Sequence, residues 1–365
     1  MRLRDVSTAV MVAAAALLLG CGGGSSSGGG GGGGSSTAFV SFPDANGVGV
    51  YRVDGAGRMT RVFGSPFATG TSPAGIAVHP NNRFIYTANQ VGMDISLLTI
   101  DARTGVLTEV LPRTPAGVGA SLMLMDKAGS RLFVGNVGAK SISVYSIDPS
   151  SGALSELANS PFSLISAPSA MILSPAEDRL YVANINLASV SVLNVAADGS
   201  LQVIPGTSTF SVGRGPKGLA VDPGNHFLYV ANSLDNNISI MRIDQASGAL
   251  SESTGSPQPA ATTPSALLMT DSGANLYAAN FGSSSVSGYS VDSGTGVLTA
   301  LANSPFSTSS GPIFMFLNPQ LNQLFVGCQT AKSVTHFTFK ASGALNSASG
   351  STTTQSAPAG IAFTH

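Results

Sequence analysis

The chain has 365 residues and a formal net charge of −1, and only 10% of its residues are charged whereas 43% are hydrophobic. Typical soluble domains carry about 25% charged residues. Nucleic-acid binding needs clustered Lys and Arg, and no basic run follows the N-terminus, so we exclude a nucleic-acid partner. The 44 glycines, together with many Ser, Thr and Asn residues, favour short strands joined by tight turns.

The N-terminus is typical of an exported protein. Two arginines precede an uncharged apolar stretch, Ala9–Leu19. Eleven residues are too few to span a hydrocarbon core of about 30 Å as a helix, but they suit the apolar region of a signal peptide over residues 1–20. The stretch ends in Leu-Leu-Gly before Cys21, which resembles a bacterial lipobox. An ordinary signal peptide with an incidental Cys is the alternative.

The lipobox resemblance implies a lipid on Cys21, and this lipid anchor makes the membrane the first expected partner. The residue after Cys21 is Gly22 rather than Asp, which resembles a signal for sorting to the outer membrane of a bacterial cell envelope. Residues 22–36 contain only Gly and Ser, so we expect residues 21–36 to form a lipidated, flexible tether with a span of roughly 20 Å. A lipidated Cys21 leaves Cys328 without an intramolecular disulfide partner.

The rest of the chain repeats. Similar segments (FIYTAN, LFVGN, LYVAN, LYVAN, LYAAN and LFVGC) end at successive spacings of 47 or 48 residues, and AFVSF lies one period earlier, which makes seven. Each period holds an apolar run, a turn, the segment above, an alternating strand such as Ser141–Ile147, an Asp-x-x-Ser/Thr-Gly turn and a short outer strand. Four antiparallel strands in each of seven repeats predict an all-β, seven-bladed propeller over residues 37–365.

The two ends of the repeat region predict how the ring closes. The region begins at the second strand of a repeat, Thr37–Ser41. It ends with PAGIAFTH (Pro358–His365), which copies the first-strand segment PAGIAVHP (Pro73–Pro80). We therefore expect the C-terminal strand to join the N-terminal blade, which removes two exposed sheet edges.

The repeated P-x-G-I-A-V…Y-V-A-N pattern resembles the YVTN repeat. Connectors such as GSPFATG (Gly64–Gly70) and NSPFSL (Asn159–Leu164) resemble those of the seven-bladed lactonase family. This family includes propeller-type 6-phosphogluconolactonase. The resemblance implies a site at the face where the connectors enter the innermost strands, which we call the upper face. It also implies His and Arg at these entries. Here Lys217 matches one such Arg, whereas Gly, Ala, Ser or Ile stand at the His positions.

Two sets of upper-face residues are candidates for ligand binding. Among the connectors, only GRGPKG is charged, and it offers Arg214 and Lys217; solvated loop charges are the alternative. The loops after the YVAN segments offer four charges that differ from blade to blade. These are Asp94, Lys140, Asp235 and Lys332. The Asn that recurs at the end of these segments is expected to bind loop backbone groups.

The sequence names no catalytic residue. His79 and His226 fall in turns at the opposite face, no His, Cys and Asp cluster has metal-ligand spacing, and no G-x-S-x-G motif is present, so no metal or cofactor is expected. We expect a cell-envelope binding or scaffold module whose upper face binds an unidentified protein or small-molecule ligand. A fold alone specifies no reaction, which favours this reading. A sugar-lactone hydrolase related to 6-phosphogluconolactonase is the alternative that the family resemblance implies.

Overall fold

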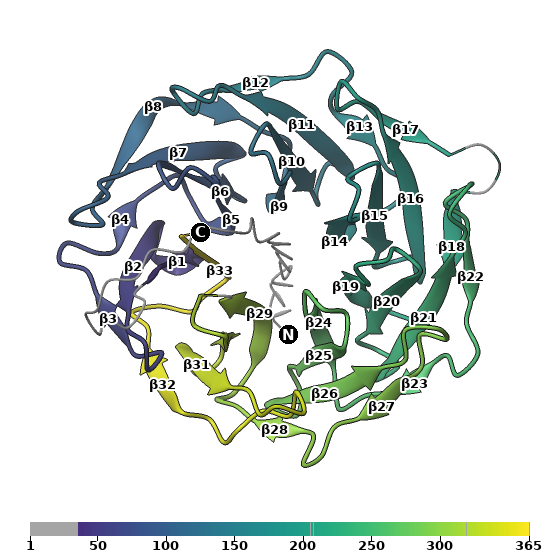
Figure 1. Cartoon of the computed structure of the whole chain (residues 1–365). Helices are drawn as coiled ribbons and strands as arrows, with labels where there is room; N and C mark the ends of the chain where they lie inside the picture. Colours follow the sequence, from purple (N-terminus) through teal and green to yellow (C-terminus); the bar gives the residue numbers. More distant parts are fainter. Residues whose placement is uncertain (1–35, 205, 207, 319, 365) are drawn as a thin grey trace, which may run out of the picture.

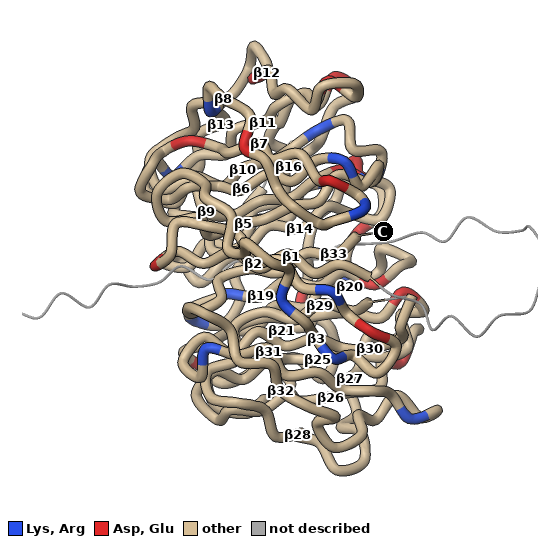
Figure 2. The backbone as a smooth tube through the Cα atoms, turned by 90° about the vertical axis from the view of Figure 1, so that its left-hand side faces the viewer, with Lys and Arg blue, Asp and Glu red and all other residues tan. Residues whose placement is uncertain are grey.

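The computed structural model describes residues 36–204, 206, 208–318 and 320–364, so the expected signal peptide, Cys21 and most of the tether lie outside the described residues. The described chain forms seven antiparallel sheets around one axis (Figure 1). Seen edge-on in Figure 2, the ring is a flattened disc on which the charged residues are thinly scattered. The predicted seven-bladed propeller is confirmed.

Each blade has an inner strand at the axis and a second strand beside it. The inner strands are β5 (Pro73–Val78), β9 (Ala120–Met125), β14 (Pro168–Leu173), β19 (Pro216–Val221), β24 (Pro264–Met269), β29 (Pro312–Asn318) and β33 (Gly360–Phe363). The second strands are β6 (Phe84–Asn89), β10 (Arg131–Asn136), β15 (Arg179–Asn184), β20 (Phe227–Asn232), β25 (Asn275–Asn280), β30 (Gln323–Cys328) and β1 (Ser36–Phe42).

A third strand and an outer strand, which is divided in two in most blades, complete each sheet. The third strands are β7 (Asp94–Ile100), β11 (Ser141–Ile147), β16 (Ser189–Val195), β21 (Asn237–Ile243), β26 (Ser285–Val291), β31 (Ser333–Thr338) and β2 (Gly47–Val53). The outer strands are β8 (Leu107–Pro115), β12 (Leu154–Glu156) with β13 (Phe162–Ser163), β17 (Leu201–Val203) with β18 (Thr209–Ser211), β22 (Leu250–Glu252) with β23 (Gln258–Pro259), β27 (Leu298–Ala300) with β28 (Phe306–Ser307), β32 (Gly350–Thr353), and β3 (Met59–Arg61) with β4 (Phe67–Ala68). We number the blades 1 to 7 from the sheet that contains β1.

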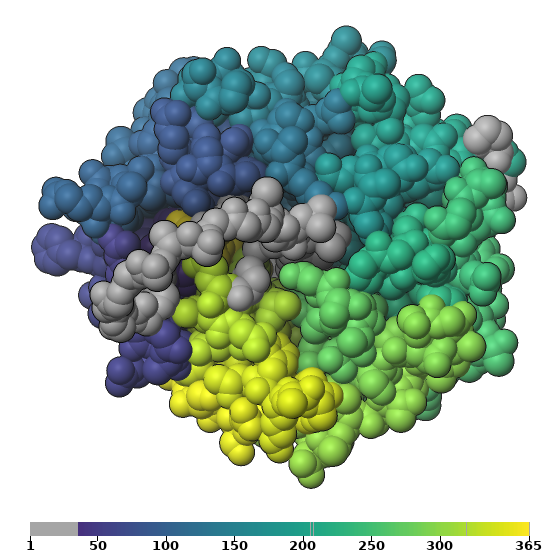
Figure 3. Space-filling view, viewed as in Figure 1, coloured from purple at the N-terminus to yellow at the C-terminus, as the bar shows by residue number. Residues whose placement is uncertain are grey.

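The core is divided among the gaps between neighbouring blades. Side chains alternate between the two faces of a strand, and in this ring another blade covers each face. The second strands are therefore apolar on both sides, as in LYVAN, and are buried along almost their whole length. Seven apolar clusters result, one in each gap, and in the space-filling view the blades form tightly packed sectors (Figure 3).

The ring closes as the sequence predicts. The C-terminal strand β33 pairs with β1 in an antiparallel register that runs from Ala38 opposite Phe363 to Ser41 opposite Gly360. In Figure 3 the purple N-terminal and yellow C-terminal segments lie next to each other. Ile361 and Phe363 are buried in the cluster between blades 7 and 1. The two ends of the described chain therefore belong to one sheet.

The repeated turn and connector motifs have direct structural roles. In the Asp-x-x-Ser/Thr-Gly turns, the Asp carboxylate accepts hydrogen bonds from backbone N–H groups; Asp148 accepts from Ser150 and Ser151 at 3.1 and 2.7 Å. In the Ser-Pro connectors, the Ser hydroxyl accepts from a third-strand N–H, as Ser160 does from Val144 at 2.9 Å. No helix among the described residues is long and apolar enough to cross a membrane.

Candidate functional site

The seven inner strands surround the central axis, and Lys217 is the only charged residue in these strands as described. Lys217 is the second residue of β19, at its upper end. The pairing of β19 with β20 shifts register between Pro216 and Gly218, so Lys217 is the unpaired residue of a β-bulge. Bulges occur often beside active sites, because they change the direction of a side chain.

The equivalent residues of the neighbouring blades indicate where the Lys217 side chain lies. Ser169 and Ser265 occupy the same bulge position, and each hydroxyl donates to a carbonyl of the next inner strand. Their acceptors are the Pro216 carbonyl, at 2.5 Å, and the Pro312 carbonyl, at 3.0 Å. A side chain at this position therefore starts between two adjacent inner strands at the upper end of the ring.

Lys217 is half-buried, and its side chain has no hydrogen bond or ion pair within the described chain. Burial lowers the pKa of its ammonium group, because a charge removed from water is disfavoured. Its inner-strand neighbours at this level carry only hydroxyl, alkyl and backbone groups. The site therefore offers one cation without a counter-ion.

Arg214 and Asp235 meet at the upper rim of blade 5. The Asp235 carboxylate accepts from the Arg214 backbone N–H at 2.6 Å and from its Nε at 2.7 Å. These bonds hold the pKa of Asp235 below its usual value. The structure thus brings together two of the predicted residues in the blade that also holds Lys217. Because they neutralise each other, the pair is a poorer ligand site than Lys217.

The other three predicted residues lie on separate blades. Asp94, in blade 2, accepts from the Asn89 side chain at 2.6 Å. Lys140 in blade 3 and Lys332 in blade 7 stand just before their third strands, with left-handed φ values of 51° and 49° and exposed side chains. Their backbone carbonyls accept from Leu164 and from Thr354 of the outer part of the blade. We read both lysines as turn residues, since equivalent turns in other blades carry uncharged residues.

The recurring Asn stabilises its own blade. Asn184, for example, is fully buried and donates from Nδ2 to the hydroxyls of Ser189 and Ser191 at 3.2 and 2.9 Å. Equivalent bonds are made by Asn136 and Asn280. The role is structural, as expected, but the partners are third-strand hydroxyls rather than the loop backbone groups that the sequence analysis predicts.

The three histidines among the described residues do not reach the upper face. His79 and His226 lie in turns between inner and second strands at the lower face, and His336 is buried within β31. His79 binds the Gly129 carbonyl at 2.9 Å, which ties two neighbouring blades together. Among the described residues, no three His, Cys, Asp or Glu side chains are grouped closely enough to hold a metal ion.

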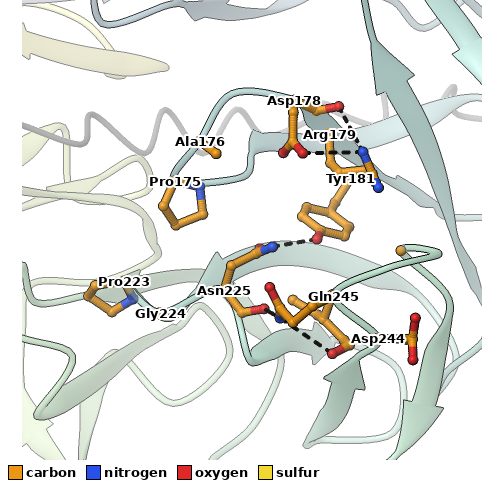
Figure 4. A pocket seen from close by; sticks show the side chains of 12 residues that line it. Pro175, Ala176, Asp178, Arg179, Tyr181, Pro223, Gly224, Asn225, Asp244 and Gln245 are labelled. Carbon is orange, nitrogen blue, oxygen red and sulfur yellow. Dashed lines mark hydrogen bonds and ion pairs between the residues drawn. The ribbon is translucent and has the colours of Figure 1, made fainter.

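A cavity of about 250 Å³ lies at the lower face, between blades 4 and 5 (Figure 4). Its lining includes Arg179 and Tyr181 from blade 4, and Asn225 and Gln245 from blade 5. This cavity was not predicted from the sequence. The turn residues gave no signal of it, because the left-handed position of Asn225 is also Asn in blades 2 and 7 and is Gly in blades 3 and 6.

Comparison with known families gives a clear result. The family described as lactonase, 7-bladed beta-propeller matches residues 45–164, 158–261 and 253–361 in succession. The chain belongs to this lactonase family. The resemblance inferred from its repeats and connectors is therefore confirmed, and so is the expected relation to 6-phosphogluconolactonase-like propellers.

Solved structures show the same fold at low identity. A periplasmic gluconolactonase from Pseudomonas aeruginosa is 18% identical, with a TM-score of 0.77 and coverage of 91% of this chain and 99% of that chain. A candidate 6-phosphogluconolactonase from Bacteroides uniformis is 16% identical, with a TM-score of 0.77 and coverage of 90% of this chain and 99% of that chain. Another from Bacteroides fragilis is 20% identical, with a TM-score of 0.76 and coverage of 91% of this chain and 98% of that chain. A comparison with curated protein sequences finds no match.

Proposed function

We propose that this lactonase-family chain is a lipid-anchored binding module of the bacterial cell envelope, which holds a small ligand bearing a carboxylate or lactone carbonyl at the upper end of the ring. Lys217 carries the proposal. Its ammonium group is half-buried and unpaired, which is unfavourable until an oxygen with negative charge or a strong dipole approaches it. A bound carboxylate would supply such an oxygen.

Binding is favoured over hydrolysis because the part of the upper face that the structure describes offers no well-placed base. Opening a lactone with water needs a group that accepts a proton from that water. Among the described upper-face loops, the carboxylates are Asp44, Asp94 and Asp235. Asp235 is paired with Arg214, and Asp94 accepts from Asn89, so both are already engaged. Asp44 is exposed in a short 3-10 turn of blade 1, away from blade 5 along the ring.

The chain enters the propeller at the face opposite this site. Strand β1 runs from Ser36 to the turn before β2 at the upper face, so Ser36 lies at the lower face. There its hydroxyl accepts from the side chain of Asn318, at the lower end of β29, at 2.8 Å. An anchor at Cys21 would therefore attach to the lower face and leave the upper face free. The fold likeness to a periplasmic gluconolactonase supports an extracytoplasmic location.

The binding proposal is tested by titrating the purified chain with D-gluconate and with D-glucono-1,5-lactone by calorimetry. We expect at least one of them to bind, and Lys217→Met to weaken that binding about tenfold or more. Lys140→Met and Lys332→Met are the matched controls, because both lysines are exposed at the upper face, and they should leave binding unchanged. Equal affinity in wild type and Lys217→Met would refute the role of Lys217.

The alternative, a sugar-lactone hydrolase related to 6-phosphogluconolactonase, is supported by family membership. It predicts turnover of sugar or homoserine lactones, measured as proton release at constant pH. Turnover that disappears in Lys217→Ala but persists in Lys332→Ala would establish the hydrolase and overturn the binding module. Rates equal to those of the uncatalysed lactones would exclude hydrolysis of these substrates.

The anchoring proposal has a separate test in a two-membrane bacterium. We expect the wild-type chain in the outer-membrane fraction, and Cys21→Ser in a soluble fraction or retained unprocessed at the inner membrane. If Cys21→Ser fractionated and migrated like wild type, Cys21 would not be lipidated. The result does not depend on which ligand the upper face binds.

A further inference from the structure

The cavity between blades 4 and 5 forms where a repeated contact between blades is altered. In three other blades, the second-strand Tyr donates to a left-handed Gly carbonyl of the next blade. The pairs are Tyr86 with Gly152 at 2.8 Å, Tyr229 with Gly296 at 3.0 Å and Tyr277 with Gly343 at 2.5 Å. Tyr181 instead donates to Asn225 Oδ1 at 3.2 Å, and Gly248, the equivalent glycine, lines the cavity.

A second contact between blades is altered at the same place. Arg83 and Arg131, which immediately precede or begin their second strands, donate to backbone carbonyls of the next blade, those of Ser150 and Ala197. Arg179 has the equivalent position in blade 4 but pairs with its own neighbour Asp178, with Nη1 and Oδ2 3.3 Å apart. The lower edges of blades 4 and 5 are therefore joined by fewer direct bonds than those of blades 2 and 3, where both contacts are made. The space between blades 4 and 5 is open (Figure 4).

Several polar atoms of the cavity lining have no hydrogen bond within the described chain. Asn225 uses Oδ1 to accept from Tyr181, which leaves its Nδ2 donor free. Gln245 uses Nε2 to donate to the Asn225 and Ile243 carbonyls, which leaves its Oε1 acceptor free. The Arg179 Nε also has no partner, but it is buried too deeply for a ligand in the cavity to reach it. The lining thus presents one amide donor, Asn225 Nδ2, and one amide acceptor, Gln245 Oε1.

The charge of the lining narrows the class of ligand. Asp178 and Asp244 both line the cavity, and Arg179 is the one cation among the lining residues, so the lining carries a net negative charge. This charge opposes phosphates and carboxylates, while the polar lining gives an apolar ligand little to contact. A hydroxyl group can donate and accept at once, which suits a lining of this kind. The volume of about 250 Å³ equals that of roughly eight water molecules at about 30 Å³ each.

We propose that this lower-face cavity binds a small, neutral, polyhydroxylated molecule of about the size of one monosaccharide. Its hydroxyls would accept from Asn225 Nδ2 and donate to Gln245 Oε1, in place of the water that otherwise solvates these atoms. The site is distinct from Lys217, which lies at the upper face, and it does not rest on the function proposed above. If the chain is anchored through Cys21, this site lies on the side where the anchor attaches.

The test uses D-glucose, D-galactose and myo-inositol as neutral probes and inorganic phosphate as the anionic probe, with saturation-transfer NMR on the purified chain. We expect at least one neutral probe to bind with a dissociation constant on the order of 1 mM, and phosphate not to compete. Ala176→Phe should abolish binding, because Ala176 is exposed in the turn that lines the cavity. Ala128→Phe is its matched control, since Ala128 is exposed at the same turn position of blade 3.

Two further variants distinguish binding in this cavity from binding at the upper face. Asn225→Gly should weaken binding about tenfold without disturbing the turn, because glycine is the residue that blades 3 and 6 carry at this left-handed position. Lys217→Met should bind the neutral probe as wild type does. The proposal is overturned if no neutral probe binds, if phosphate displaces the probe, or if Ala176→Phe and Ala128→Phe bind it equally well.

Discussion

The hydroxyl of Ser333 is buried without a hydrogen-bond partner, because Cys328 stands at the second-strand position from which an Asn side chain donates in other blades. In blade 4 the equivalent residue, Asn184, donates to both Ser189 and Ser191. The Cys328 thiol is fully buried and lies 3.7 Å from the Thr335 hydroxyl, a distance at which a thiol makes only a weak bond. Burial raises the pKa of this thiol, so it stays protonated at neutral pH.

We therefore predict that Cys328→Asn stabilises the protein. The Asn amide would donate to Ser333 and Thr335, and the free energy of unfolding should rise by about 0.5–2 kcal/mol. Urea denaturation followed by fluorescence or circular dichroism measures this change. The reverse substitution in blade 4, Asn184→Cys, should destabilise by a similar amount. Equal stability of wild type and Cys328→Asn would show that the buried Ser333 hydroxyl has no energetic consequence.

The aromatic contacts that seal the ring should contribute strongly to stability. Phe363 of β33 is buried against Phe316 and Phe325, with ring centroids 4.7 and 4.9 Å apart. Phe363→Ala should lower the free energy of unfolding by about 3–5 kcal/mol, through lost burial and the cavity left behind. The control is Phe63→Ala, because Phe63 is 97% exposed and its loss should change stability by less than about 0.5 kcal/mol. Similar losses in the two variants would contradict the sealing role of β33.

Lys217 should reduce stability while it serves binding. An unpaired ammonium group in a half-buried position is disfavoured, so Lys217→Met should raise the melting temperature by about 1–3 °C at pH 7. The pKa of Lys217 is lowered in the folded state, so the fold disfavours the charged form below the unfolded pKa of about 10.4. The advantage of Lys217→Met should therefore shrink as the pH rises through the folded pKa. Calorimetry from pH 7 to pH 10 tests this, and a lower melting temperature for Lys217→Met at pH 7 would contradict it.

The turn aspartates should make stability sensitive to acid. Backbone N–H and hydroxyl donors hold the pKa values of Asp148 and Asp244 below normal. A carboxylate with a lowered folded pKa stabilises the fold above its unfolded pKa of about 3.9, and this contribution is lost as the pH falls through the folded value. The double variant Asp148→Asn, Asp244→Asn keeps the acceptor oxygens but does not titrate. Its melting temperature should fall less than that of wild type between pH 4 and pH 2, and parallel curves would exclude the effect.

Repetition explains why so much of the fold could be predicted. A spacing of 47 or 48 residues fixed the number of blades, and the likeness of Pro358–His365 to Pro73–Pro80 predicted the β33–β1 pairing. The repeat also placed Lys217 at the upper end of an inner strand. Its position on a bulge could not be foreseen, because a bulge depends on how two strands pair rather than on either strand alone.

Contacts between loops and between blades could not be predicted from the repeat pattern. The bond between Arg214 and Asp235 joins a connector to a loop 21 residues later, and no motif marks it. Tyr181 and Tyr229 both stand in the segment LYVAN, yet they bind different groups of the next blade. Tyr181 binds the Asn225 side chain beside the cavity, and the identical segments do not distinguish the two tyrosines.

The position of β33 also constrains how the protein is made. Among the described strands, the inner strand of blade 1, β33, is synthesised last, whereas its partner β1 is synthesised first. A nascent chain therefore carries an unpaired β1 edge, with its row of open backbone groups, until β33 has been synthesised. A premature stop codon anywhere before Gly360 would leave that edge permanently open, so even a nearly full-length product should be prone to aggregate.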